Sequence, residues 1–419
     1  MSDIGFDSFD LPEAVRAGLR DAGFEKCTPI QADTLPIVLA GRDVAGQART
    51  GTGKTAAFLL AIFNKLLADP DPDSAGHNPR SIVIAPTREL AIQIHRDALL
   101  LGSHTGLTFG LAYGGVDYQK QRDRLTEGVD VLIGTPGRVI DYFKQNVFNL
   151  KNIRIAVLDE ADRMFDLGFI GDIRYLFRAM PPVDKRQCLM FSATFPLKVT
   201  ELAYEHMNDA ETIRIDEDHK TTERVSQVVY YPSNREKLPL LIKLLREMVD
   251  GHVIVFVNTR RAADLVDRML RGNGFDSAML AGSVPQKKRQ RLLEKFHSGE
   301  LPILVATDVA ARGLHIPDVS HVINFDLPQD AADYVHRIGR TARLGATGKA
   351  ISFACEDYAF YLPEIETYID QSIDLISHDT EDLPKLERAE APSGNRGQPA
   401  SSRGGKGRGR SGGGRRRRG

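Results

Sequence analysis

The sequence contains little cysteine and no cysteine cluster. Its three cysteines, Cys27, Cys188 and Cys355, lie far apart in the chain, and no two of them form a CxxC pair. Zinc frameworks and disulfide scaffolds both depend on grouped cysteines, so we expect no zinc site and no disulfide scaffold. This cysteine usage is typical of a reducing compartment, and we expect a cytoplasmic location.

Long apolar stretches are also absent. No uninterrupted apolar run approaches the roughly 20 residues that span a bilayer, so no membrane segment is expected. Residues 1–11 have no basic start and no apolar core, and we therefore expect no secretory signal there. The chain has 419 residues, of which 42% are hydrophobic, and this size favours two globular domains.

Acidic residues are missing from the C-terminal end of the chain. Residues 393–419 carry nine of the 55 Lys and Arg residues and no acid, which leaves 46 basic against 56 acidic residues elsewhere. Apolar residues become rare past residue 382, and this composition predicts a disordered tail over residues 383–419. A basic tail on an acidic body suggests a polyanionic partner. The tail has no aromatic side chain to stack on bases, so its contact should be independent of sequence and sensitive to salt.

Short apolar runs alternate with helical patterns in both halves of the chain. The runs expected as strands are residues 43–45, 81–85, 131–133, 155–158 and 188–191, and then 252–257, 302–306, 321–325 and 349–353. This alternation predicts βαβ units on parallel sheets, and therefore an α/β fold. A polar stretch without periodicity separates the halves, so we predict domains at residues 1–215 and 225–382, joined by a linker at 216–224.

Residues 48–55 match the Walker A pattern, with alanine at the usual first glycine. The pattern follows an expected strand and opens a helix, where glycines let backbone N–H groups approach phosphates. Lys54 is expected to reach the β- and γ-phosphates, and Thr55 to ligate Mg²⁺. The expected nucleotide contacts are Ala48, Arg49, Thr50, Gly51, Thr52, Gly53, Lys54 and Thr55.

Three carboxylates, Asp159, Glu160 and Asp162, follow the apolar run at residues 155–158. Ligands bind at the carboxyl ends of strands in open α/β sheets, and a Walker A site needs a second, acidic strand end to hold its metal. We expect Asp159 to bind Mg²⁺ directly or through water, and Glu160 to orient and deprotonate the attacking water. Asp162 is assigned a structural or coupling role. Taken alone, the three acids would also fit a solvated turn.

With these motifs and those that follow, the chain resembles the DEAD-box RNA helicases of superfamily 2 over roughly residues 5–360. Residues of about 7–35 resemble the family's Q motif, which implies that Gln31 hydrogen-bonds adenine and that Phe24 stacks on it. The resemblance also implies two tandem RecA-like domains, ATP and Mg²⁺ as cofactors, and RNA as a partner.

Two further motifs resemble the parts of the family that connect the domains. Ser192 and Thr194 resemble the motif that couples hydrolysis to unwinding, although a Ser-x-Thr after a strand is also a common helix N-cap. Residues 336–343 resemble motif VI, in which Arg340 and Arg343 are arginine fingers that reach the γ-phosphate when the domains close. The resemblance implies a coupling role for His336, facing Asp162.

The expected RNA contacts share small side chains, helix starts or arginines, which suit phosphate binding. They are Pro86, Thr87, Arg88, Gly114, Gly115, Thr135, Pro136, Gly137 and Arg138 in the first half, and Arg260, Gln286, Arg289 and Thr307 in the second. Individually, each of these is more often a turn or a cap than an RNA contact.

Three positions depart from the family pattern, and one of them is Ala281, which precedes Gly282 where a His-Gly pair is common. His315 stands where the family usually has an aspartate that binds the ATP ribose, and a histidine can still donate or accept a hydrogen bond there. Ala342 replaces the usual glycine of motif VI, a change that should be mild.

Residues 113–115, 312–317 and 354–359 and the Arg-rich C-terminal end resemble bacterial members of the family that act in the RNA degradosome. This implies ribonuclease E as a partner of the second domain and polynucleotide phosphorylase as a beneficiary. The expected function is therefore an RNA-dependent ATPase that locally unwinds RNA duplexes during RNA decay. Two other functions stay open, an RNA-binding scaffold whose ATP site only clamps, and a DNA helicase or other P-loop motor.

Overall fold

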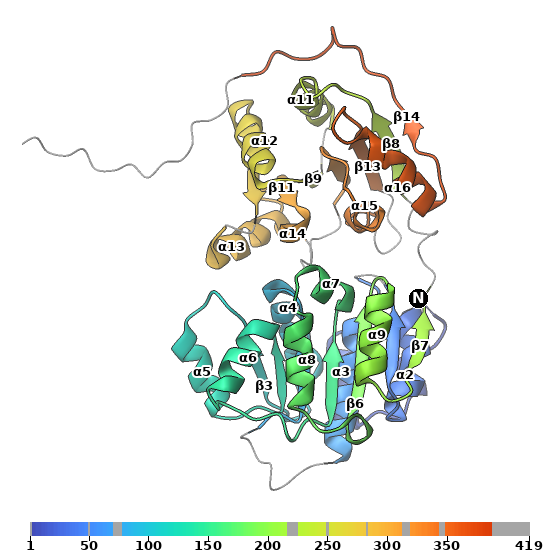
Figure 1. Ribbon diagram of the computed structural model, residues 1–419, viewed down its shortest axis with the longest axis vertical. Helices are drawn as coiled ribbons and strands as arrows, with labels where there is room; N and C mark the ends of the chain where they lie inside the picture. The colour runs from blue at the N-terminus through green and yellow to red at the C-terminus, as the bar shows by residue number, and fades with distance from the viewer. Residues whose placement is uncertain are drawn as a thin grey trace, which may run out of the picture.

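The computed structural model describes residues 2–48, 51–69, 78–215, 225–248, 251–281, 284–311, 319–342 and 348–387. These residues form two α/β domains, one above the other in Figure 1, and each domain is built on one seven-stranded sheet. Every strand pairing within the two sheets is parallel. The predicted pair of parallel-sheet domains is therefore confirmed. The expected linker at 216–224 lies outside the described residues.

The sheet of the first domain has the strand order β3-β4-β2-β5-β6-β1-β7. Its strands are β1 (Val44–Gln47), β2 (Ser81–Ile84), β3 (Phe109–Ala112), β4 (Val131–Gly134), β5 (Ile155–Leu158), β6 (Gln187–Ser192) and β7 (Glu211–Arg214). Every residue of β2, β4, β5 and β6 is buried. Apolar runs form these strands because helices cover both faces of the sheet.

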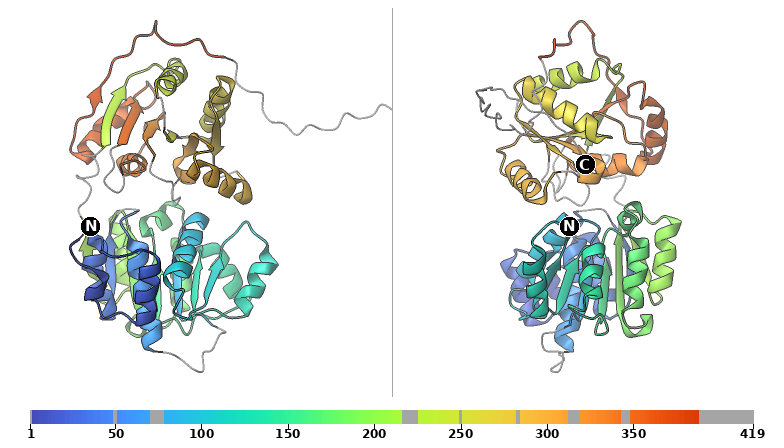
Figure 2. Two further views of the ribbon diagram at one scale, coloured as in Figure 1. Left: turned by 180° about the vertical axis from the view of Figure 1, so that it is seen from behind. Right: turned by 60° about the vertical axis from the view of Figure 1, so that its left-hand side comes forward.

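Helices of the first domain form one layer on each face of its sheet. One layer holds α1 (Glu13–Asp21), α2 (Pro29–Leu39), α3 (Lys54–Ala68) and α4 (Arg88–Leu101), seen from behind in Figure 2. The other holds α6 (Pro136–Lys144), α7 (Ala161–Asp166), α8 (Ile170–Arg178) and α9 (Leu197–His206). The remaining helix, α5 (Tyr118–Thr126), contacts the edge strand β3.

The sheet of the second domain has the order β10-β11-β9-β12-β13-β8-β14. Its strands are β8 (Val225–Tyr230), β9 (Val253–Val257), β10 (Ser277–Leu280), β11 (Ile303–Thr307), β12 (His321–Asn324), β13 (Gly348–Phe353) and β14 (Asp374–Leu375). Its helices are α11 (Lys237–Glu247), α12 (Arg260–Gly272), α13 (Gln286–His297), α14 (Asp308–Ala311), α15 (Ala331–Ile338) and α16 (Leu362–Ile369).

Packing against the second domain continues beyond residue 382. Leu383 and Leu386 are partly buried against the apolar cluster beneath α11 and α12, and the backbone N–H of Glu387 donates to Asn273 Oδ1 at 3.0 Å. The tail boundary predicted at residue 383 is thus wrong by at least five residues, because two leucines in a polar stretch are enough to attach it. The basic segment 393–419 lies outside the described residues.

Within the part of the chain that the structure describes, no helix combines the length and the apolar character needed to cross a membrane.

Candidate ATP and RNA sites

Strand β5 places the predicted catalytic acids at the edge of the sheet that faces the second domain. All four of its residues are buried, and Asp159, which follows directly, is 2% exposed. Glu160 is 9% exposed and has a φ of 52°. This left-handed backbone is unfavourable for a residue with a side chain, and such strain is concentrated at functional sites.

The Walker A segment brings its lysine to the same edge. Gly53, with a φ of 93°, makes the turn into α3, and Lys54 is the first residue of that helix. Lys54 Nζ donates to the carbonyl oxygen of Ala48 at 2.8 Å and lies 3.8 Å from Asp159 Oδ1. The structure therefore brings together the predicted lysine and the predicted metal-binding acid. Arg49 and Thr50 lie outside the described residues.

Burial dominates the electrostatics of the two acids. It raises the pKa of Asp159, and the positive charge of Lys54 partly offsets the rise. Burial also raises the pKa of Glu160, and the neighbouring Asp159 raises it further. The two buried carboxylates repel each other, and a cation bound beside them would offset that repulsion.

The donors at this edge suit Mg²⁺. Thr55 supplies a hydroxyl and Asp159 a carboxylate, and oxygen ligands of this kind are those that Mg²⁺ prefers. Over the described ranges, no group of three or more His, Cys, Asp or Glu side chains is arranged to hold a metal ion. A magnesium ion that keeps several waters and also binds phosphates needs only a few protein ligands. The residues present therefore fit a magnesium ion.

A pocket of about 200 Å³ joins most of the predicted ATP contacts. It is lined by Phe24, Gly51, Gly53, Lys54, Thr55, Asp159 and Glu160, and also by residues of α4 that were not predicted, Leu90, Gln93, Asp97, Leu100 and Leu101. This second wall could not be predicted from the sequence, because α4 reaches the pocket only through the packing of one helix beside another.

Gln31, the predicted adenine contact, is 1% exposed and bonded to the protein at both ends of its amide. Its Oε1 accepts from the backbone N–H of Thr28 at 2.8 Å, in a capping box that starts α2. Its Nε2 donates to the carbonyl oxygen of Gly53 at 2.9 Å. The amide thus connects α2 to the phosphate loop. Its contact with adenine stays a prediction, and that contact would require the amide to give up these two hydrogen bonds.

Three of the predicted coupling residues lie in one hydrogen-bonded group. Asp162 Oδ2 accepts from both the backbone N–H and the hydroxyl of Thr194, each at 2.9 Å. The backbone N–H of Asp162 donates to Ser192 Oγ at 3.0 Å. The end of β6 is therefore tied to the start of α7, beside the catalytic acids.

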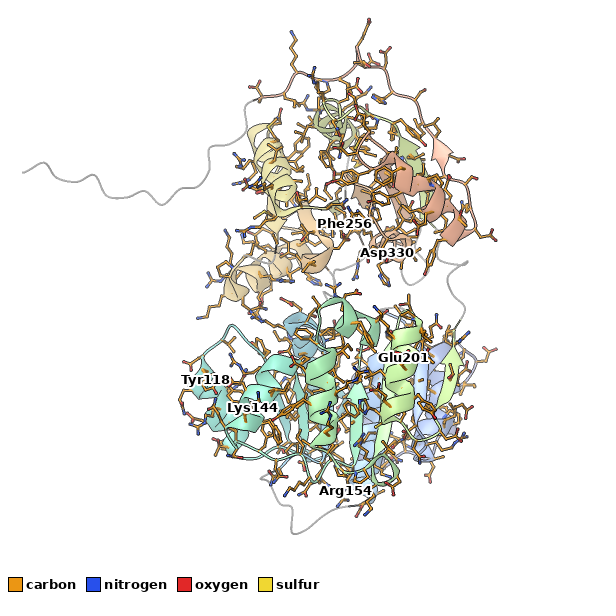
Figure 3. All side chains as sticks on the ribbon, in the orientation of Figure 1. Tyr118, Lys144, Arg154, Glu201, Phe256 and Asp330 are labelled. Carbon is orange, nitrogen blue, oxygen red and sulfur yellow. The ribbon has the colours of Figure 1, made fainter. Side chains whose placement is uncertain are left out.

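A larger pocket, of about 870 Å³, lies between the domains. Its lining includes Glu160, Asp162 and Thr194 from the first domain, and His336 and Arg340 from the second. Figure 3 shows Asp330, another lining residue, on the side of the second domain that faces the first. Arg340 is 5% exposed, and its charge lowers the pKa of Glu160. Arg343 lies outside the described residues, as does His315.

Six of the nine predicted RNA contacts of the first domain line a third pocket, of about 330 Å³. Its lining is Pro86, Arg88, Gly114, Thr135, Gly137, Arg138 and Phe169. A side chain at Gly115, whose φ is 86°, would lie 2.4 Å from Arg88 Nη1. The positive φ is what favours a glycine there, because the end of the flexible arginine could move aside. Phe169 was not predicted.

The second domain meets this region through Glu89, which was also not predicted. Glu89 Oε1 accepts from Gln286 Nε2 at 3.0 Å and lies 2.9 Å from Arg289 Nε. Arg289 Nη2 also donates to the carbonyl oxygen of Ala310 at 2.6 Å. Two predicted RNA contacts of the second domain are thus held against the first, whereas Arg260 is exposed at the start of α12 and Thr307 ends β11.

Ala342 has a φ of 58°, in the region that favours glycine. In this left-handed conformation, an alanine costs about 1–2 kcal/mol relative to a glycine. The expectation that this replacement is mild is corrected, because the backbone conformation could not be read from the residue type.

Profiles of two protein families match most of the folded chain. The DEAD/DEAH box helicase family matches residues 28–202, and the helicase conserved C-terminal domain matches residues 236–345. The RNA helicase RhlB of Xanthomonas axonopodis is 57% identical over 391 residues, which are 93% of this chain and 68% of that protein.

Solved structures of DEAD-box proteins agree with these matches. Yeast Dbp5 bound to RNA and ADP BeF3 is 32% identical, with a TM-score of 0.80 over 90% of this chain and 97% of that one. A DEAD-box protein from Methanococcus jannaschii is also 32% identical, with a TM-score of 0.51 over 89% of this chain and 99% of that one. The chain belongs to the DEAD-box family of ATP-dependent RNA helicases, and it is similar to the RhlB members of that family.

Proposed function

We propose that the protein is an RNA-dependent ATPase that locally unwinds RNA duplexes when its two domains close on ATP and RNA. The observation that carries the proposal is the shared lining of the interdomain pocket, where Glu160 of the first domain and Arg340 of the second meet. A site divided between two domains works only when they approach, so RNA that stabilises closure also stimulates hydrolysis.

The position of each predicted catalytic side chain supports one role in ATP hydrolysis. Lys54 neutralises charge on the β- and γ-phosphates, and Glu160 orients the attacking water and accepts its proton. Arg340, together with Arg343, stabilises the charge that develops on the transferred phosphoryl group. Mg²⁺, held by Thr55 and Asp159, would supply further neutralisation of phosphate charge. The group formed by Asp162, Ser192 and Thr194 transmits the state of the site to the second domain.

Replacing the proposed base tests this function. The Glu160→Gln variant should bind ATP and RNA normally, while its RNA-stimulated turnover falls by roughly 10²–10⁴-fold because the water loses its proton acceptor. Glu201→Gln, on the exposed face of α9, is the matched control and should behave as wild type. Equal turnover in the wild type and the Glu160 variant would favour an ATP-dependent clamp. Stimulation by single-stranded DNA as strong as by RNA would favour a DNA motor.

The basic tail supports an additional RNA contact. Deleting residues 393–419, with nine cations and no acid, should weaken RNA binding and flatten its dependence on salt, because fewer counterions are then released. The ATPase rate at saturating RNA should change little. Equilibrium binding measured from low to high salt provides the test, and an unchanged slope would remove this role from the tail.

We extend the proposal to a cellular setting on the basis of the resemblance to RhlB proteins. The protein would act in the cytoplasm within an RNA degradosome, with ribonuclease E contacting the second domain and polynucleotide phosphorylase degrading the unwound RNA. Measuring the RNA-stimulated ATPase rate with and without the ribonuclease E segment tests this extension. A rate that the segment does not change, together with absence of binding, would refute it.

A further inference from the structure

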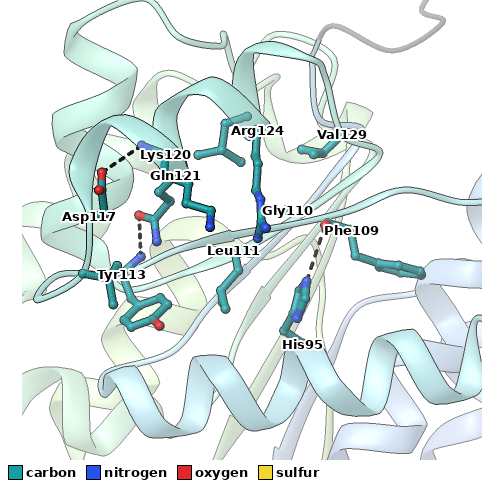
Figure 4. A pocket seen from close by; sticks show the side chains of 12 residues that line it. His95, Phe109, Gly110, Leu111, Tyr113, Asp117, Lys120, Gln121, Arg124 and Val129 are labelled. Carbon is teal, nitrogen blue, oxygen red and sulfur yellow. Dashed lines mark hydrogen bonds between the residues drawn. The ribbon is translucent and has the colours of Figure 1, made fainter. Parts of the chain in front are cut away.

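A fourth pocket, of about 260 Å³, lies at the outer edge of the first domain, and one of its lining residues, Tyr113, forms a side-chain hydrogen bond with Gln290 of the second domain. It forms between α4 and α5, over the edge strand β3 (Figure 4). Its floor and sides are apolar and are formed by Phe109, Leu111, Leu125 and Val129. None of the residues predicted to bind ATP or RNA lines it.

Two cations without a partner enter this pocket from α5. Lys120 and Arg124 extend from the helix over β3 in Figure 4. Among the described residues, no hydrogen bond or ion pair is made by either side-chain charge. The one acid in the lining, Asp117, accepts the backbone N–H of Lys120 at 3.0 Å and so caps the helix. The pocket therefore combines an apolar surface with an uncompensated positive charge.

A single side chain separates this pocket from the pocket that holds the predicted RNA contacts. Gln121 Oε1 accepts from the backbone N–H of Tyr113 at 3.2 Å, inside the outer pocket. The same oxygen accepts from Arg138 Nη1, a lining residue of the RNA pocket, at 3.4 Å. Tyr113 also directly precedes Gly114, which lines that pocket. A strand that leaves the RNA pocket past Gln121 enters the outer pocket next.

We propose that this outer pocket, lined by Lys120, Arg124, Leu111 and Tyr113, binds one nucleotide of the RNA strand beyond those held by the RNA pocket. The base lies on the apolar surface, and the adjoining phosphate lies between Lys120 and Arg124. The volume admits one nucleotide and not a length of strand. The inference rests on the RNA binding proposed above and adds a further subsite to it.

The opposite edge of the pocket explains why an RNA strand fits it better than a protein strand. The free edge of β3 could pair with another strand, but at the pocket His95 Nε2 lies 3.4 Å from the carbonyl oxygen of Phe109. That carbonyl is therefore already paired with a side chain from α4. Two uncompensated cations over an apolar surface match a phosphate and a base instead.

Single-stranded oligouridylates that differ in length by one nucleotide test the subsite. For the wild type, affinity should rise by a distinct step at the length that first fills the outer pocket. The Lys120→Ala/Arg124→Ala variant should lose that step and bind shorter oligomers as the wild type does. The slope of its binding against salt should fall by about 0.7, since the variant loses one phosphate contact and each such contact on a single strand contributes about 0.7.

A control variant with the same change in charge separates the subsite from general electrostatics. Lys151→Ala/Arg178→Ala removes two exposed cations that line none of the four pockets and should keep the step. Photo-crosslinking with a terminal 4-thiouridine should label the lining of the outer pocket in the wild type only with oligomers past the step.

The outcomes distinguish this inference from the function on which it rests. Failure of the wild type to bind any oligouridylate would refute both the RNA-binding function and the subsite. Binding with the same step in the Lys120/Arg124 variant, or crosslinks confined to the RNA pocket, would overturn the subsite alone and leave the β3 edge as a place for a protein strand. Equal losses in the test and control variants would reduce the effect to net charge and would also overturn it.

Discussion

Asp97 is a half-buried carboxylate in the ATP pocket to which no motif assigns a role. Within the described residues, its carboxylate makes no hydrogen bond and no ion pair. Burial raises its pKa to about 6, although the nearby Arg96 opposes the rise. Above pH 6 the folded protein therefore holds a charge that water would solvate better in the unfolded chain.

Replacing this carboxylate should stabilise the protein in a way that depends on pH. Above pH 6, Asp97→Asn removes the cost of burying the charge, so the free energy of unfolding should rise by about 1–2 kcal/mol after allowance for partial exposure. The gain should shrink as the pH falls from 6 toward 4, because the folded wild type then protonates Asp97 while the unfolded chain still does not. Thermal or denaturant unfolding at pH 8 and pH 5 measures it. Asp33→Asn, on an exposed position of α2, is the control, and an equal effect in both variants would contradict this account.

At this scale the sequence predicts best where chemistry is local. Lys54 and Asp159 are separated by more than 100 residues, yet each belongs to a short motif, and the structure places their side chains 3.8 Å apart. Asp97 lies in no such motif, and Glu89 was assigned no role although it lies in a segment that resembles a family motif. Their positions follow from the packing of α4 against other elements, which a linear pattern does not contain.

Most strands inside the two sheets were predicted from the sequence, whereas the strands at the edges of the sheets were missed. The runs expected in the first half correspond to β1, β2, β4, β5 and β6, whereas the edge strands β3 and β7 were not identified. The edge strands β10 and β14 of the second sheet were also missed, and so was β8, although it lies inside that sheet between β13 and β14. Edge strands are covered less completely, as the half-buried β7 illustrates, and so need no continuous apolar run.

The contact between α1 and α4 depends on a glycine. A Cβ added at Gly18 would lie 2.0 Å from the carbonyl oxygen of Leu101, so one helix would have to move. Gly18→Ala should lower the free energy of unfolding by about 1–3 kcal/mol, as overpacking of a core does. It should also weaken ATP binding, because α1 leads directly to Phe24. Denaturant unfolding and nucleotide titration measure the two effects.

Gly171 in α8 provides the matched control for this substitution. A Cβ at Gly171 would meet no atom within 4 Å, so Gly171→Ala should be neutral or stabilise the helix by about 0.5–1 kcal/mol. Equal destabilisation by both substitutions would mean that helix propensity, and not the close approach of α1 to α4, accounts for the result.

On the scale of the whole molecule, the described contacts between the domains lie on both sides of the cleft. Arg340 and Glu160 line the ATP side, and Gln286 and Arg289 contact Glu89 on the RNA side. The family resemblance led us to expect Arg340 at the site that contains Glu160. The contacts of Gln286 and Arg289 with Glu89 were not predicted, since they join residues some 200 positions apart whose meeting depends on domain placement. ATP and RNA would thus each stabilise the same closed arrangement, which is the condition for coupling between two sites.

The ion pair between Glu89 and Arg289 should stabilise this closed arrangement. Their side chains are 9% and 11% exposed, so the pair is desolvated and its loss leaves one charge buried. In a double-mutant cycle with Glu89→Ala and Arg289→Ala, we expect a coupling free energy of about 1–3 kcal/mol for closure, measured by fluorescence transfer between dyes on the two domains with an ATP analogue and RNA. Arg174→Ala, which breaks the partly exposed pair with Glu205 inside the first domain, should leave closure unchanged. Strictly additive effects of the two substitutions would show that Arg289 acts through RNA alone, because a side chain that only binds phosphate has no reason to depend on Glu89.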